Sequence, residues 1–211
     1  MSRFFLVSFL PMLMMSSSCQ VKDRGQEVHE LFLAEQNTNF KDSEHSPLTD
    51  SDLAEFKFIN YYPYDPAYRI EARWVLTPDE EPFPMPTSTK RAPLYRKYGE
   101  FHFELDGREL VLAAYRSLDL KVIEGFEEHL FIPFNDLTNG VTSYAGGRYI
   151  DFSIPTTESV NLDFNNSYHP YCAYSHKYSC PIPPDENMLD VEIEAGVKLG
   201  LNGIVEETEE H

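Results

Sequence analysis

The chain has 211 residues, of which 42% are hydrophobic and 14% aromatic, enough to bury one sizeable core but not two. It carries 35 acidic and 17 basic residues, a formal net charge of -18. Such a surface repels the phosphates of DNA and RNA, so nucleic acids are excluded as partners.

Residues 1–18 are predicted to be a secretory signal peptide. The apolar run from Phe4 to Met15 is too short to span a bilayer, and three serines follow it. Cys19 comes directly after these serines, an arrangement similar to a bacterial lipoprotein signal. We therefore expect a lipid anchor on Cys19 that holds an exported protein to a membrane of the cell envelope. Ordinary cleavage near Ser18, with Cys19 incidental, is the alternative.

The polar stretch that follows is predicted to be a tether with one short helix. Helical spacing of apolar residues indicates a helix from about Gln26 to Asn39, with Leu31 and Phe32 touching the core. A flexible tether is the alternative. Thr49, with Asp52 three positions later, indicates a second short helical turn.

From about residue 51 the patterns are those of β-strands. Residues 68–76 alternate between apolar and charged, which predicts a half-buried strand. The dipeptide Asp106-Gly107 predicts a hairpin with a two-residue type I′ turn. That register sets Phe103 opposite Leu110 on one face and Glu104 opposite Glu109 on the other face.

Three further apolar runs lie in the C-terminal half. Residues 129–134 are predicted to form a strand in which Pro133 marks an edge or an end, since proline lacks the ladder donor. Residues 148–154 alternate, with Tyr149 and Asp151 on the face opposite the apolar one. Residues 189–195 alternate as a last strand.

These patterns predict an all-β fold, mostly antiparallel, closed as a barrel or a sandwich with a short N-terminal helical segment. The expected organisation is a signal peptide, a lipid-anchored tether with its helix, a single β domain and an acidic tail. The boundaries that we expect are 1–18, 19–50, 51–200 and 201–211.

Long ordered strings resemble one family. YYPYDPAYRIEARW, LFIPFNDLTNGVTSYAGGRYIDF and PYCAYSHKYSCPIPPDEN look like those of the bacterial and archaeal Domain of Unknown Function 1684 family. The resemblance covers roughly residues 30 to 200. It implies no established activity. Many members of that family carry Asn where this chain has His169.

Cys172 and Cys180 are predicted to form a disulfide, because an exported protein meets oxidising conditions and the two cysteines are eight positions apart. Two alternatives are open. The thiols are free and buried, or they bind a metal together with His169 and His176, whose spacing superficially resembles a zinc knuckle.

Arg148 lies on the apolar face of its predicted strand, where its charge needs an anion. An internal partner, Asp163 or Glu186, is favoured over a ligand. The candidate ligand-binding side chains all belong to the C-terminal half: Arg148, Asp151, Asp163, His169, Tyr171, Glu186 and Asn187.

The expected function is that of a cell-envelope lipoprotein that binds a small or lipidic ligand. A hydrolase or isomerase that uses carboxylates and His169 near Arg148 is the alternative. Glycine motifs for nucleotides and the G-x-S-x-G motif of serine hydrolases do not occur in the sequence. We therefore expect no cofactor and no resident metal, and we assign no catalytic residue.

Overall fold

The computed structural model describes residues 23–202. The predicted signal peptide, the predicted lipid site at Cys19 and nearly all of the predicted acidic tail lie outside these residues. Within the described range, no helix is both long and apolar enough to cross a membrane.

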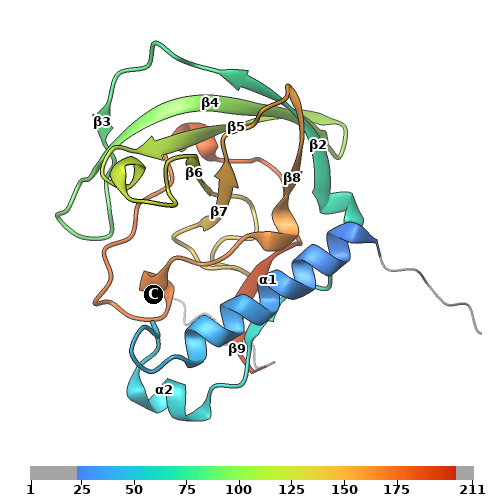
Figure 1. Cartoon of the computed structure of the whole chain (residues 1–211). Helices are drawn as coiled ribbons and strands as arrows, with labels where there is room; N and C mark the ends of the chain where they lie inside the picture. The colour runs from blue at the N-terminus through green and yellow to red at the C-terminus, as the bar shows by residue number, and fades with distance from the viewer. Residues whose placement is uncertain (1–22, 203–211) are drawn as a thin grey trace, which may run out of the picture.

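A seven-stranded sheet, curled into a half-barrel, forms the body of the protein (Figure 1). Its strands are β2 (Arg69–Leu76), β3 (Phe83–Pro84), β4 (Leu94–Leu105), β5 (Arg108–Ser117), β6 (His129–Phe134), β7 (Arg148–Ser153) and β8 (Ser159–Asp163). Their order is β7-β6-β5-β4-β2-β8, and β3 pairs with β4. A two-stranded sheet pairs β1 (Ile59–Tyr61) with β9 (Val197–Leu201). All these pairings are antiparallel, which confirms the predicted fold class.

Helical elements lie outside the sheets. They are the α-helices α1 (Arg24–Lys41) and α2 (Asp50–Glu55) and the short 3-10 turns η1 (Pro66–Tyr68), η2 (Leu120–Val122), η3 (Phe164–Asn166), η4 (Tyr171–Ala173) and η5 (Asp185–Asn187). Helix α1 lies across one end of the curled sheet (Figure 1). It buries His29 and Phe40, whereas the predicted core contact Leu31 is 73% exposed. The prediction was wrong for Leu31 because the buried stripe of α1 falls on other positions, whereas Phe32 is half-buried and its ring centre lies 6.1 Å from that of Tyr61. The helix expected from about Gln26 to Asn39 is confirmed as α1.

Helix α2 begins as the sequence predicts. The side chain of Thr49 accepts a hydrogen bond from the backbone N–H of Asp52 at 3.2 Å. This bond satisfies one of the free N–H groups at the helix start.

The hairpin of β4 and β5 has the predicted register. Phe103 lies opposite Leu110, and Glu104 lies opposite Glu109. Asp106 and Gly107 have φ angles of 53° and 71°. These left-handed values are what a type I′ turn requires.

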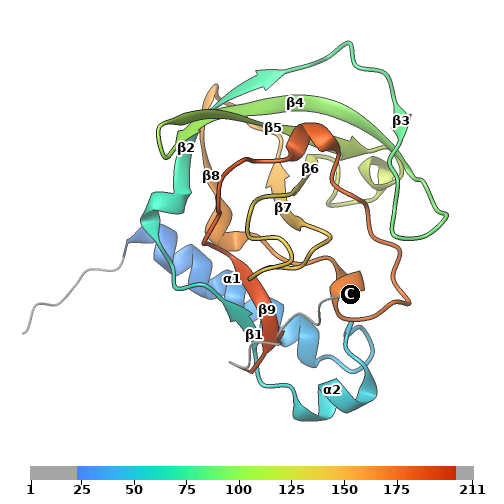
Figure 2. The same cartoon turned by 180° about the vertical axis from the view of Figure 1, so that it is seen from behind.

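The main core lies on the concave face of the curled sheet, where the segment 188–196 covers it (Figure 2). This segment was predicted to be a strand, and that prediction was wrong. Leu189 and Ile193 are buried as the alternation indicates, but the backbone follows the loop after β6 instead of a sheet. Leu189 N donates to Asn135 O at 2.8 Å, and Leu137 N donates to Val191 O at 2.9 Å. An extended chain can alternate in burial without joining a ladder.

A gap between β5 and β6 is filled by the side chain of Asn187. These strands share a single register pair, Tyr115 with Phe131. Asn187 accepts from Ala113 N at 2.8 Å and donates to the carbonyls of Ala113 and Pro133 at 2.9 and 2.7 Å. In a strand, the N–H and the C=O of one residue point to the same side. Because the carbonyl of Pro133 points into this gap, the N–H that proline lacks would also have pointed there. Proline is therefore tolerated near the end of β6, inside the sheet.

Candidate functional site

The residues proposed from the sequence do not converge on one point. Arg148 is fully buried and pairs with Asp136, Nη2 to Oδ2 at 2.6 Å, with both side chains 0% exposed. Its guanidinium also donates to the carbonyls of Ile193 at 2.9 Å and Ala195 at 2.5 Å. The partner is neither of the carboxylates that the sequence suggested. This network ties β7 to the loop after β6 and to the segment 188–196.

His169 is buried with 3% exposure. Its Nε2 accepts the backbone N–H of Tyr144 at 3.0 Å. Burial, together with the nearby charge of Arg148, lowers the pKa of His169 to about 3. The ring is therefore neutral, and its accepting nitrogen is occupied by the protein's own backbone.

Asp163 and Glu186 lie in separate places. Asp163 accepts from Asn165 N at 3.0 Å and so caps η3. Glu186 accepts from the hydroxyl of Tyr115 at 2.6 Å and from Lys97 Nζ at 2.7 Å. Both carboxylates hold local structure together.

Cys172 and Cys180 are free thiols, which corrects the predicted disulfide. The backbone N–H of Cys172 donates to Cys180 Sγ at 3.2 Å, and Cys180 N donates to Ser88 Oγ at 3.1 Å. A hydrogen bond from the Cys180 thiol lowers the pKa of Cys172 to about 6, and the same bond raises the pKa of Cys180. Hydrogen bonds, rather than a covalent link, hold this turn.

The metal alternative finds no ligand set. In residues 23–202, no three side chains of His, Cys, Asp or Glu are grouped so that they could hold a metal ion. His169, which the zinc-knuckle spacing includes, is turned to Tyr144.

Two of the proposed residues, Asp151 and Tyr171, line one hollow of about 420 Å³. One wall of this hollow is the face of β4, β6 and β7 that points away from the main core. The other wall is the segment 168–181, which includes Cys180. We call this hollow the aromatic cleft. Its aromatic side chains are Tyr95, Phe126, Phe131, Tyr149, Tyr168, Tyr171 and Tyr178. A concave, largely apolar site with few polar groups is typical of small-molecule binding.

Asp151 contributes a carboxylate to the aromatic cleft, and its side chain is 50% exposed. Its Oδ1 lies 2.9 Å from Nε2 of His129, and its Oδ2 accepts from the hydroxyl of Tyr168 at 2.7 Å. Nδ1 of His129 is buried and has no hydrogen-bond partner within the described part of the chain. These contacts fix the carboxylate in one orientation.

The hydroxyls of Tyr149 and Tyr168 stay protonated in the cleft. Burial raises the pKa of Tyr149, whose hydroxyl donates to the carbonyl of Pro181. Burial and the charge of Asp151 raise the pKa of Tyr168 well above its usual range. These rings offer neutral aromatic surface rather than phenolate bases.

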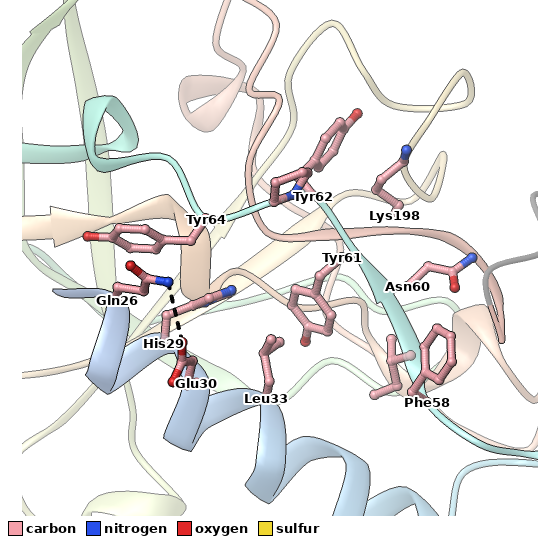
Figure 3. A pocket seen from close by; sticks show the side chains of 12 residues that line it. Gln26, His29, Glu30, Leu33, Phe58, Asn60, Tyr61, Tyr62, Tyr64 and Lys198 are labelled. Atoms are coloured by element: carbon pink, nitrogen blue, oxygen red, sulfur yellow. Dashed lines mark hydrogen bonds between the residues drawn. The ribbon is translucent and has the colours of Figure 1, made fainter. Parts of the chain in front are cut away.

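A second hollow, of about 520 Å³, lies between α1 and β1, whose side chains face each other across it (Figure 3). His29 Nδ1 lies 2.9 Å from Asn166 Oδ1. The Tyr62 hydroxyl lies 2.5 Å from Thr142 Oγ1, and Lys198 Nζ lies 4.8 Å from the centre of the Tyr62 ring. These polar groups already have partners within the protein, and no residue proposed from the sequence lines this hollow. The aromatic cleft is the stronger candidate.

Sequence reasoning missed His129 and Tyr168 as parts of the site. The sequence held a signal for His129. His129 and Phe131 are two positions apart in one strand and so point to the same face, and Phe131 lies opposite Asp151 in the register of β6 and β7. Tyr168 carried no such signal. It follows η3 in an irregular segment and meets Tyr149 through an isolated bridge.

Comparisons with known proteins agree with this fold. The family model described as "Protein of unknown function (DUF1684)" matches residues 54–198. The solution NMR structure of an uncharacterised protein from Haloarcula marismortui is 32% identical in sequence and superposes with a TM-score of 0.66. That similarity covers 84% of this chain and 95% of the other. No curated protein is significantly similar to this chain.

Proposed function

This chain belongs to the DUF1684 family of proteins of unknown function, and we propose that it is a ligand-binding module of the cell envelope whose aromatic cleft holds a small organic molecule. One observation carries the proposal. Seven aromatic side chains and one half-exposed carboxylate line a hollow of about 420 Å³, a size within the range of known ligand pockets.

Binding is favoured over catalysis because, within the described residues, the carboxylate of Asp151 has no imidazole with a free nitrogen beside it in the cleft. Acid–base catalysis usually needs a second proton donor or acceptor within reach of the substrate. His129 directs Nε2 to Asp151, and its other ring nitrogen is buried. The alternative of a hydrolase or isomerase built on His169 and Arg148 needs both side chains at a surface, yet they are 3% and 0% exposed.

The envelope part of the proposal rests on the sequence. An apolar run followed by three serines and Cys19 supports export and lipid attachment at that cysteine. We expect the full-length protein to partition with membranes and the Cys19→Ser variant to be released from them. Mass spectrometry of the N-terminal peptide would report the acyl chains directly. An unmodified Cys19 in membrane-extracted protein would contradict this part.

The binding part is tested by what the protein retains. Full-length protein is extracted gently from its own membrane, and the bound small molecules are identified by mass spectrometry. Tyr171→Ala removes one ring of the aromatic cleft and should lose the retained molecule. Phe58→Ala in the hollow beside α1 is the matched control, since Phe58 is 44% exposed and Tyr171 is 38% exposed. Equal retention by both variants would refute the assignment of the cleft.

A further inference from the structure

We infer that the ligand of the aromatic cleft is a small organic cation, an amine or a quaternary ammonium ion. This inference rests on the proposed function and adds the charge of the ligand. Among residues 23–202, the lining carries one carboxylate, that of Asp151, and no lysine or arginine. A cleft of this composition stabilises a positive charge and repels a negative one.

Asp151 is held ready to receive a cation. His129 and Tyr168 each engage one oxygen of its carboxylate, at 2.9 and 2.7 Å. An ionised carboxylate has about four lone-pair positions, so these two contacts leave acceptor positions on both oxygens. Half of the side chain is exposed. The carboxylate therefore needs little reorganisation to accept an N–H group or to lie beside a methylated nitrogen.

The surrounding rings supply the second attraction. The face of an aromatic ring carries negative electrostatic potential and attracts ammonium groups within about 6 Å of its centroid. The Tyr178 ring is already engaged in this way, because Lys177 Nζ lies 5.0 Å from its centre, so the other rings of the cleft remain for a ligand. Burial keeps the hydroxyls of Tyr149 and Tyr168 protonated, so these rings remain neutral.

The charge of the whole chain acts in the same direction. A formal net charge of -18 raises the local concentration of cations near the surface and lowers that of anions. Anionic metabolites would meet both this field and the carboxylate of Asp151. Neutral molecules that stack on aromatic rings meet no such penalty, so they are the competing outcome that the experiment must separate.

The test uses choline and its neutral isostere 3,3-dimethylbutan-1-ol, which differ in charge but hardly in shape. Calorimetric titration of the full-length protein should show choline binding at least ~10-fold more tightly than the alcohol, the ratio expected when cation–π attraction and a carboxylate act together. Asp151→Asn keeps the size of the side chain and should weaken choline binding by ~10-fold or more. Asp190→Asn makes the same change in net charge at a side chain that is 81% exposed and outside the cleft. It should leave binding unchanged.

A lipid headgroup and a free amine share this chemistry. Dihexanoyl-phosphatidylcholine below its micellar concentration separates them, since binding much tighter than that of choline would identify the lipid as the source. If the alcohol binds as tightly as choline and Tyr171→Ala weakens both, the inference about charge is refuted and the cleft remains a binding site. If neither probe binds, the inference about a cation is also refuted. If the extraction experiment then finds a retained neutral molecule, the proposed function stands although the inference about a cation fails.

Discussion

Replacing Arg148 by alanine removes the positive half of a fully buried ion pair. Asp136 is then left with no cation beside it, although its Oδ1 still accepts from the backbone N–H groups of Thr138 and Ile193 at 2.9 and 3.2 Å. The carbonyls of Ile193 and Ala195 lose their charged donor as well. Breaking a buried pair from one side typically destabilises a protein by about 3 to 5 kcal/mol.

This free energy corresponds to a large shift in melting temperature. For a domain of about 150 to 250 residues, 1 kcal/mol lowers Tm by roughly 2 to 4 °C. Arg148→Ala should therefore melt about 6 to 20 °C below the wild type in a scan followed by circular dichroism without ligand. Urea unfolding of the same two proteins gives the free energy independently.

Arg108→Ala is the matched control. Arg108 pairs with Asp190 at 2.8 Å, but these side chains are 54% and 81% exposed. Exposed pairs contribute about 0 to 1 kcal/mol, so this variant should melt within a few degrees of the wild type. If Arg148→Ala melted no lower than Arg108→Ala, the reasoning would fail. Arg148 would then return as a candidate for ligand binding.

Three further predictions concern His169, Cys172 and Asn187. Because burial lowers the pKa of His169 to about 3 and an unfolded histidine titrates near ~6.5, the unfolded chain binds more protons between these values. The free energy of unfolding should therefore fall as the pH drops from ~6.5 towards ~3. Urea titrations at several pH values measure this dependence, which should be weaker in the His169→Gln variant. An unchanged slope in that variant would contradict the prediction. Cys172 should react with iodoacetamide at neutral pH well before Cys180, since its pKa is lowered to about 6 while that of Cys180 is raised; peptide mapping that found equal labelling would refute this order. Asn187→Ala strands the N–H of Ala113 and two carbonyls in the gap between β5 and β6, so it should lower the free energy of unfolding by about 3 kcal/mol or more; a loss below about 1 kcal/mol would show that water replaces the side chain.

Where a structure depends on neighbours in the chain, the sequence predicted it well. The turn at Asp106-Gly107 needs left-handed φ angles, which this dipeptide adopts readily, and the turn then fixes every pair of the hairpin. Alternation in 68–76 and 148–154 predicted two strands for the same reason, and the observed strands are Arg69–Leu76 and Arg148–Ser153. Side chains in a strand point to opposite faces whatever their partner is.

The same local reasoning failed where a distant segment decides the outcome. Residues 189–195 alternate like a strand, but their backbone bonds to the loop after β6 and no sheet edge receives them. Leu31 has helical spacing with apolar neighbours, yet α1 turns His29 and Phe40 inward. The pattern correctly indicated alternating burial in 189–195 and a helix around Leu31. Which segment packs against these residues, and through which side chains, depends on the tertiary structure.

The sequence by itself determined the class of fold, the family resemblance, the charge and the segment that holds most candidate residues. It placed Tyr149 and Asp151 on one face of a strand, and both line the aromatic cleft. Only the tertiary structure decided that Arg148 pairs with Asp136, that His129 and Tyr168 contact Asp151, and that Tyr171 lines the same cleft. These contacts join β6, β7 and the segment 168–181, and no spacing along the chain encodes the distance between segments that meet only when the sheet curls.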